Sequence, residues 1–110
     1  CFDGLARQIH PLTQSNVDRL FELCGLMPDS KWTNFCLSVN AASSFGMGDR
    51  EISYKICGRI AESGKKNCYN RIFGNMSVYI KNREEFYSLC EKITETGWRK
   101  QCVDMPFGNL

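Results

Sequence analysis

The sequence predicts an all-α fold of stacked antiparallel helical hairpins, with about 33 residues per repeat and one disulfide per hairpin. The first observation is the cysteine spacing: Cys24, Cys57 and Cys90 are evenly spaced, and Cys36, Cys68 and Cys102 recur with the same period to within one position. The second is that apolar residues around the first series recur at helical spacing. The third is that turn-forming residues stand midway between the two cysteines of each unit.

The cysteines of the first series have matching neighbours. An aromatic residue stands three positions before each one and an apolar residue three positions after it, namely Phe21, Tyr54, Tyr87 and Met27, Ile60, Ile93. Side chains at these offsets share one face of a helix. An acid six positions before, Asp18, Glu51 or Glu84, falls in the first turn, where the helix dipole favours negative charge. We therefore expect first helices over 15–27, 49–61 and 82–94.

Turn-forming residues separate each first helix from a second one. They are Pro28-Asp29-Ser30, Glu62-Ser63-Gly64 and Glu95-Thr96-Gly97. The recurring hydroxyl residue, Ser30, Ser63 or Thr96, is predicted to be the N-cap of the second helix, which carries the second cysteine. Second helices are expected over 31–45, 65–79 and 97–105. Trp32 and Trp98 occupy one position in the outer units, with Lys65 between them, and we interpret the tryptophans as hairpin packing residues.

These units predict a single α-helical repeat domain over residues 1–110. Residues 1–12 are expected to be the end of a preceding repeat, followed by repeats over 13–48, 49–80 and 81–110, the last of them incomplete. The beginning Cys1-Phe2-Asp3-Gly4-Leu5 resembles Cys68-Tyr69-Asn70-Arg71-Ile72 in its order of cysteine, aromatic, Asx and aliphatic residues. The chain is therefore expected to be a section of a longer array.

The six cysteines of the two series are predicted to form one disulfide in each hairpin. Because the turn lies midway, both cysteines reach the same height on facing helices, where Cα atoms can approach to the ~5.5–6 Å that a disulfide needs. The predicted bonds are Cys24–Cys36, Cys57–Cys68 and Cys90–Cys102, each worth about 2–3 kcal/mol by chain entropy. A zinc site is the alternative, but it normally needs closer ligand pairs than C-x10-C. No metal ligand is therefore predicted.

Three disulfides predict an oxidising, extracytoplasmic location, which is secreted, periplasmic or at the cell surface. Cys1 is left unpaired within this chain. It is either the second cysteine of a missing hairpin, which its neighbours favour, or the lipid-bearing first residue of a bacterial lipoprotein. Asn75-Met76-Ser77 matches the N-glycosylation pattern, so Asn75 is a candidate acceptor, although such triplets often arise by chance.

No residue pattern predicts catalysis or cofactor binding, and we expect the protein not to be an enzyme. His10, the one histidine, is interpreted as an exposed loop residue rather than a catalytic base. The net charge of +2 is too small to predict nucleic-acid binding, and no apolar run approaches the ~18 residues of a membrane span. Lys65-Lys66 and Arg99-Lys100 are interpreted as part of a solvated face.

In hairpin length and period, the array is similar to tetratricopeptide-type and Sel1-type α-solenoids. The resemblance covers nearly the whole chain but is one of architecture, since the small-residue pattern of the former and the alanine and glycine columns of the latter are absent. It implies an extended face for recognition. We therefore expect a protein-binding or structural scaffold module that joins a protein partner or larger assembly. The alternative is a small secreted helical carrier with an apolar pocket. A secreted hydrolase domain completed by residues outside this chain is a third and weaker hypothesis.

Overall fold

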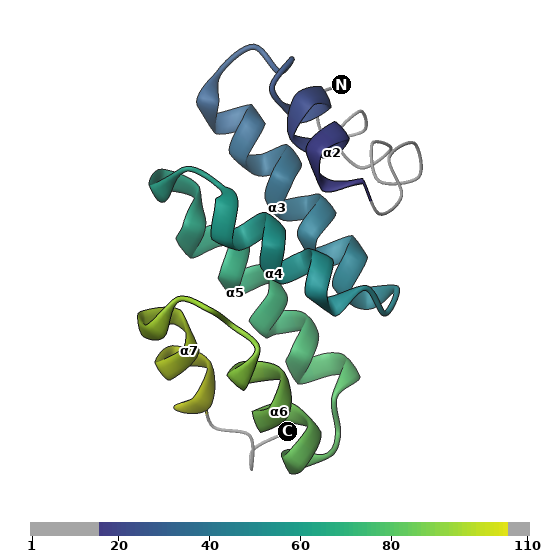
Figure 1. Cartoon of the computed structure of the whole chain (residues 1–110), viewed down its shortest axis with the longest axis vertical. Coiled ribbons are helices and arrows are strands. Elements are labelled where there is room, and N and C mark those ends of the chain that lie inside the picture. The colour runs from purple at the N-terminus through teal and green to yellow at the C-terminus, as the bar shows by residue number, and fades with distance from the viewer. Residues whose placement is uncertain (1–15, 106–110) are drawn as a thin grey trace.

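The computed structural model describes residues 16–105, and this part of the chain contains six α-helices and no strand. They are α2 (Val17–Cys24), α3 (Ser30–Gly46), α4 (Arg50–Arg59), α5 (Glu62–Tyr79), α6 (Arg83–Glu91) and α7 (Thr96–Val103). Figure 1 shows them succeeding one another along the long axis, from α2 at one end to α6 and α7 at the other. The all-α prediction is confirmed. Between residues 16 and 105, no helix has both the length and the apolar character needed to cross a membrane.

Three disulfides join consecutive helices. We call two helices joined by one of these bonds a helix pair, and the three helix pairs are α2–α3, α4–α5 and α6–α7. The bonds are Cys24–Cys36, Cys57–Cys68 and Cys90–Cys102, which are the three that the spacing predicts. The Cα atoms of each bond are 5.5–5.6 Å apart, as facing interior positions allow. All six cysteines are fully buried. The disulfides are therefore part of the core.

The first helix of each pair ends two or three residues before its predicted end. In α2 and α6 the cause is a tight last turn. The amide of Met27 donates to the Cys24 carbonyl and that of Ile93 to the Cys90 carbonyl, both at 3.1 Å. Bonds between residues three apart narrow the turn and lead the chain out of the helix. The apolar residues three positions after the first cysteine of each bond, Met27, Ile60 and Ile93, are still buried. They therefore belong to the core although they lie outside the helices.

The predicted N-caps of the second helices are wrong. Ser30, Ser63 and Thr96 each lie inside the first turn of their helix. The N-cap of α3 is Asp29, whose Oδ1 accepts a hydrogen bond of 2.9 Å from the Trp32 amide. The Asp29 carboxylate, one position before Ser30, therefore accepts the capping hydrogen bond that the sequence predicts for the Ser30 hydroxyl. Helices α5 and α7 follow Ala61 and Glu95, neither of which makes a side-chain cap bond.

Helices α3 and α5 form the middle of the fold, where α3 packs against both α4 and α5. Phe45 of α3 and Tyr69 and Met76 of α5 are among the largest fully buried side chains. Polar groups link the same helices. Ser53 of α4 donates from Oγ to the Ala41 carbonyl of α3 at 2.8 Å. Because this hydroxyl is buried, the bond satisfies a group that would otherwise destabilise the fold.

Helix α5 begins in close contact with α3. A Cβ at Gly64 would lie 2.7 Å from Cγ of Asn34 and 2.9 Å from Cδ1 of Ile60. Asn34 is itself held in place, because its Nδ2 donates to Oγ of Ser63 at 3.1 Å. The crossing of the first and second helix pairs at this point therefore requires glycine.

Replacing Gly64 with alanine is expected to lower the free energy of unfolding by about 1–3 kcal/mol, because the added methyl group must displace Asn34 or Ile60. Gly74, in the same helix, has no atom within 4 Å of its Cβ position. Gly74→Ala should therefore raise stability by about 0.5–1 kcal/mol through helix propensity. Urea unfolding followed by circular dichroism measures both changes. Equal effects at the two positions would contradict the close contact.

Candidate functional site

The cysteine side chains offer no free thiol in the described part of the chain, because all six there are bonded and buried. Cys1 and His10 lie outside the described residues. Within 16–105, the His, Cys, Asp and Glu side chains form no group of three that could hold a metal ion.

Asn75, the candidate glycosylation residue, lies inside α5. Its Nδ2, the atom that a glycan would occupy, donates to the Ala42 carbonyl of α3 at 2.8 Å. The side chain is half-buried. In the folded chain this amide therefore links two helices.

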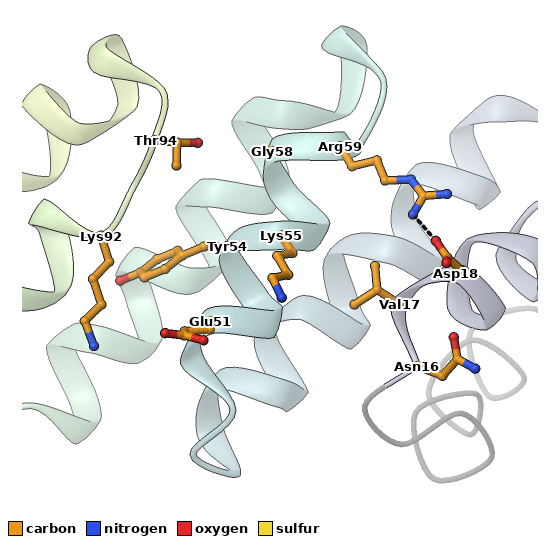
Figure 2. Close-up of a pocket in the computed structure, with 10 residues that line it drawn as sticks. All are labelled: Asn16, Val17, Asp18, Glu51, Tyr54, Lys55, Gly58, Arg59, Lys92 and Thr94. Carbon is orange, nitrogen blue, oxygen red and sulfur yellow. Dashed lines mark hydrogen bonds and ion pairs between the residues drawn. The ribbon is translucent and has the colours of Figure 1, made fainter.

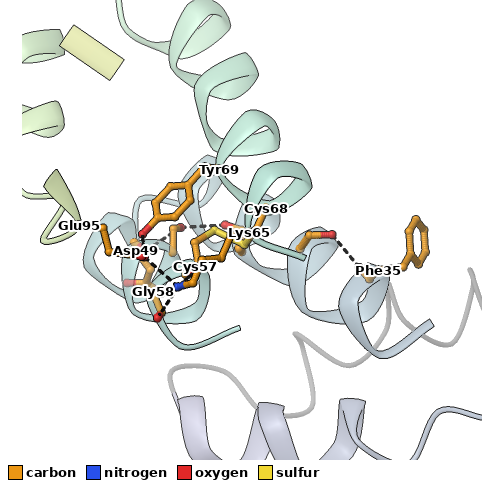
Figure 3. The surroundings of a disulfide bond; sticks show 11 residues. Phe35, Asp49, Cys57, Gly58, Lys65, Cys68, Tyr69 and Glu95 are labelled. Carbon is orange, nitrogen blue, oxygen red and sulfur yellow. Dashed lines mark hydrogen bonds and ion pairs between the residues drawn. A yellow bond between two sulfur atoms is a disulfide. The ribbon is translucent and has the colours of Figure 1, made fainter. Parts of the chain in front are cut away.

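A buried lysine lies beside the central disulfide (Figure 3). Nζ of Lys65 in α5 donates to the carbonyl oxygens of Cys57 at 3.2 Å and Gly58 at 2.8 Å, near the end of α4. The same Nζ lies 2.9 Å from Oε1 of Glu95, and the Tyr69 hydroxyl donates to that oxygen at 2.8 Å. Lys65, Tyr69 and Glu95 form what we term the polar cluster.

The polar cluster connects the second and third helix pairs. Lys65 and Tyr69 belong to α5, whereas Glu95 directly precedes α7. The Tyr69 ring also stacks on Trp98 of α7, with 4.9 Å between the ring centroids. The last carbonyls of a helix lack partners within it and carry negative partial charge. One ammonium group thus satisfies the end of α4 and holds the carboxylate that precedes α7.

The electrostatics of the cluster favour a charged Glu95. Partial burial raises the pKa of this carboxyl, but hydrogen bonds from Lys65 and Tyr69 and the lysine charge outweigh it, so the pKa lies below its usual range. Burial raises the pKa of the Tyr69 hydroxyl, and its bond to the Glu95 carboxylate raises it further. Tyr69 therefore stays protonated and remains a donor.

The sequence prediction of a solvated face is wrong for Lys65, whose side chain is 9 % exposed. A signal for its burial is present in the sequence, because Lys65 occupies the position held by Trp32 and Trp98 in the flanking units. Its neighbour Lys66 is exposed, as predicted. Trp98, interpreted from the sequence as a hairpin packing residue, packs against the core and also contacts the preceding helix pair through Tyr69.

A groove of about 900 Å³ runs across α2, α4 and the residues that follow α6 (Figure 2). Its charged and aromatic lining comes from Asp18, Glu51, Tyr54, Lys55, Arg59 and Lys92. The charged side chains among these are exposed. A second hollow of about 510 Å³ shares Glu51 and Lys92 with the groove and continues towards Ser88 of α6. The two hollows are therefore adjacent, and together they are lined by residues of all three helix pairs.

Arg59 closes one end of the groove. Its guanidinium pairs with Asp18 of α2 at 2.5 Å and lies over the Phe21 ring, 4.4 Å from the centroid. Both contacts join α4 to α2. Exposed ion pairs contribute about 0–1 kcal/mol each, so this bridge orients the two helices more than it stabilises them.

Tyr54 lies at the base of the groove. The residue is 8 % exposed, and its hydroxyl has no hydrogen-bond partner among the described residues. Burial raises the pKa of this hydroxyl, while the positive charge of Arg50 opposes the rise, and the net result is a raised value. The Tyr54 hydroxyl is therefore protonated, and it is a buried donor that makes no hydrogen bond within the described residues.

Comparisons with known proteins do not assign the chain to a family. No model of a known protein family matches it, and no curated protein and no solved structure matches it either. A functional interpretation therefore starts from the groove and the polar cluster.

Lys65→Met is expected to lower the free energy of unfolding by about 1–3 kcal/mol, because methionine fills the volume but leaves two carbonyls and a carboxylate without their donor. Lys66→Met removes the same charge from an exposed neighbour and should change stability by less than about 0.5 kcal/mol. Chemical unfolding of both variants provides the comparison. A similar loss for Lys66→Met would show that charge, rather than the buried contacts, is responsible.

The lowered pKa of Glu95 predicts a pH dependence. A carboxyl whose pKa is lower in the folded state stabilises the fold above its unfolded value, which is 4.5 for Glu95, and this contribution is lost as the pH falls through the folded value. The difference in unfolding free energy between wild type and Glu95→Gln should therefore be constant near neutral pH and shrink in acid. Glu91→Gln, at the exposed end of α6, should show no such loss. A pH-independent effect of Glu95→Gln would refute the charge assignment.

Proposed function

We propose that this chain is an extracytoplasmic protein–protein interaction or scaffold module. Its three helix pairs would be the repeats of a solenoid-like array, and its groove would receive a segment of a partner protein. The observation that carries the proposal is the groove itself, which is open and lined by side chains of successive helix pairs. Solenoids present such extended faces to their partners.

Two features support the array. The cysteines of corresponding bonds recur at a nearly constant interval in the sequence, and each bond joins the same two positions of its helix pair. The molecule is also elongated, with dimensions of 40 × 24 × 22 Å and a radius of gyration of 13.6 Å. The longest dimension is more than one and a half times each of the other two, as expected when units are added along one axis.

The lining of the groove favours a protein partner over an apolar ligand. Carriers of small apolar molecules enclose them in pockets with mostly hydrophobic walls. The groove described above is open, and five of the residues named in its lining are charged. Side chains of this kind suit a peptide, whose backbone and side chains offer many polar groups.

The disulfides support the compartment. Three intramolecular disulfides indicate an oxidising, extracytoplasmic environment. A module that meets its partner there keeps a fixed surface without relying on a large core. Secretion, the periplasm and the cell surface are all consistent with this proposal.

Site-specific photocrosslinking tests the proposed function. A photoreactive amino acid at Lys55, in the groove, is expected to capture a defined partner in the native compartment, and excess unlabelled wild-type protein should compete. The same group at Lys66, exposed on α5 outside the groove, is the control and should capture much less. Capture from Lys66 alone, or none from Lys55, would contradict the proposed surface.

A further inference from the structure

A second surface, which shares no lining residue with the groove and the hollow beside it, lies between helices α3 and α5. The two helices run in the same direction (Figure 1). The Asn34 amide donates to the Ser63 hydroxyl near their beginnings, and a Cβ at Gly46 would lie 3.6 Å from the Tyr79 ring at their ends. Hollows of about 360 and 380 Å³ lie near the beginnings and the ends respectively, and both are lined by Arg71. We call the combined lining of these two hollows the α3–α5 surface.

The α3–α5 surface is positively charged. Among the described residues, its lining contains Lys31 and Arg71 and no carboxylate. Both cations are exposed, and neither forms an ion pair within residues 16–105. The carboxylates nearest in sequence lie outside this lining: Asp29 caps α3, Asp49 lines the hollow beside the groove, and Glu62 begins α5. An acidic ligand is therefore complementary to this surface.

The charge of the lining agrees with that of the second helices as a group. Helices α3, α5 and α7 carry six Lys or Arg residues and one Glu, whereas α2, α4 and α6 carry five Lys or Arg residues and six Asp or Glu residues. Two of the six cations are paired, Lys65 with Glu95 and Lys100 with Asp104. The other four form no ion pair in the described part of the chain, and they are Lys31, Lys66, Arg71 and Arg99. Excess positive charge thus belongs to the second helices and attracts acidic chains to them.

Exposed apolar side chains lie at the end of the surface where the two helices finish. Met47 and Tyr79 line the same hollow as Arg71, and they are 72 % and 56 % exposed. Methionine, arginine and aromatic residues are the types that are enriched at protein interfaces. An anionic saccharide has no apolar group to place on Met47, whereas a polypeptide segment carries acidic and apolar side chains together. The combination therefore favours a protein segment.

We propose that the α3–α5 surface binds an extended acidic segment of a protein that also carries an apolar side chain. Carboxylates of the segment pair with Lys31 and Arg71, and its apolar side chain packs on Met47 and Tyr79. From Lys31 to Met47 the helix rises about 24 Å, which corresponds to about seven residues of extended chain. The inference goes beyond the proposed function, because this surface is separate from the groove.

A labelled synthetic peptide with blocked ends tests this surface. Its sequence is Leu-Ala-Glu-Ala-Glu-Ala-Glu-Ala-Leu, which presents acidic and apolar side chains in either chain direction. Two matched peptides replace each glutamate with glutamine or each leucine with alanine. The glutamate peptide is expected to bind saturably and to shift the NMR amide signals of α3 and α5. The glutamine peptide should bind about tenfold more weakly, and the alanine peptide about threefold more weakly.

Variants separate this surface from general charge and exposure. Lys31→Gln and Arg71→Gln should each weaken binding of the glutamate peptide about two- to fivefold, whereas Lys55→Gln, in the groove, should have no such effect. In the double variant of Lys31 and Arg71, the glutamate and glutamine peptides should bind alike. Met47→Ser should weaken binding about threefold. Leu26→Ser is the matched control, because Leu26 is 77 % exposed but lies outside the surface.

Three outcomes overturn the inference. Equal binding of the glutamate and glutamine peptides, or unchanged affinity in both Lys31→Gln and Arg71→Gln, excludes the acidic segment. Weaker binding in Lys55→Gln alone moves the peptide to the groove. A heparin hexasaccharide that binds more tightly than the peptide, and is weakened by the two cation variants but not by Met47→Ser, replaces the protein segment with an anionic saccharide. None of these outcomes affects the proposed function, because crosslinking from Lys55 tests the groove separately and its control, Lys66, lines neither surface.

Discussion

Every helix pair depends on a disulfide that joins facing positions of its two helices. Helices α2, α6 and α7 are only eight or nine residues long, and helices of that length are marginal in water on their own. A bond between cysteines 11 or 12 residues apart holds such a helix against its neighbour and buries both sulfur atoms. The contacts between helix pairs, such as the Gly64 crossing and the stacking of Trp98 on Tyr69, form between helices that the disulfides hold in place.

Those contacts use different chemistry at the two joints between helix pairs. The first and second pairs meet through close backbone packing at Gly64 and through the Arg59 bridge. The second and third meet through the polar cluster and the stacked rings of Tyr69 and Trp98. The two joints between helix pairs are therefore unequal. Similar sequences therefore produce dissimilar surfaces.

The sequence predicts the helices and the disulfide pairing because both follow from spacing along the chain. It does not predict the N-caps, because Asp29 and Ser30 are both good caps and only the backbone geometry selects between them. The burial of Lys65 depends on Glu95, which is 30 residues away in sequence. Local sequence patterns do not predict the groove either, because its lining residues come from three different helix pairs. Local periodicity describes each pair, but contacts between pairs decide the site.

Neighbouring residues Thr94 and Glu95 belong to different parts of the molecule. Thr94 lines the groove, whereas Glu95 accepts hydrogen bonds in the polar cluster. A single peptide unit thus connects the groove to the joint between the second and third helix pairs. An occupant of the proposed interface that favours a wider or narrower groove would also favour one arrangement of that joint, and such a coupling is reciprocal. In the proposed scaffold, the shape of the groove and the arrangement of the second and third helix pairs are consequently linked.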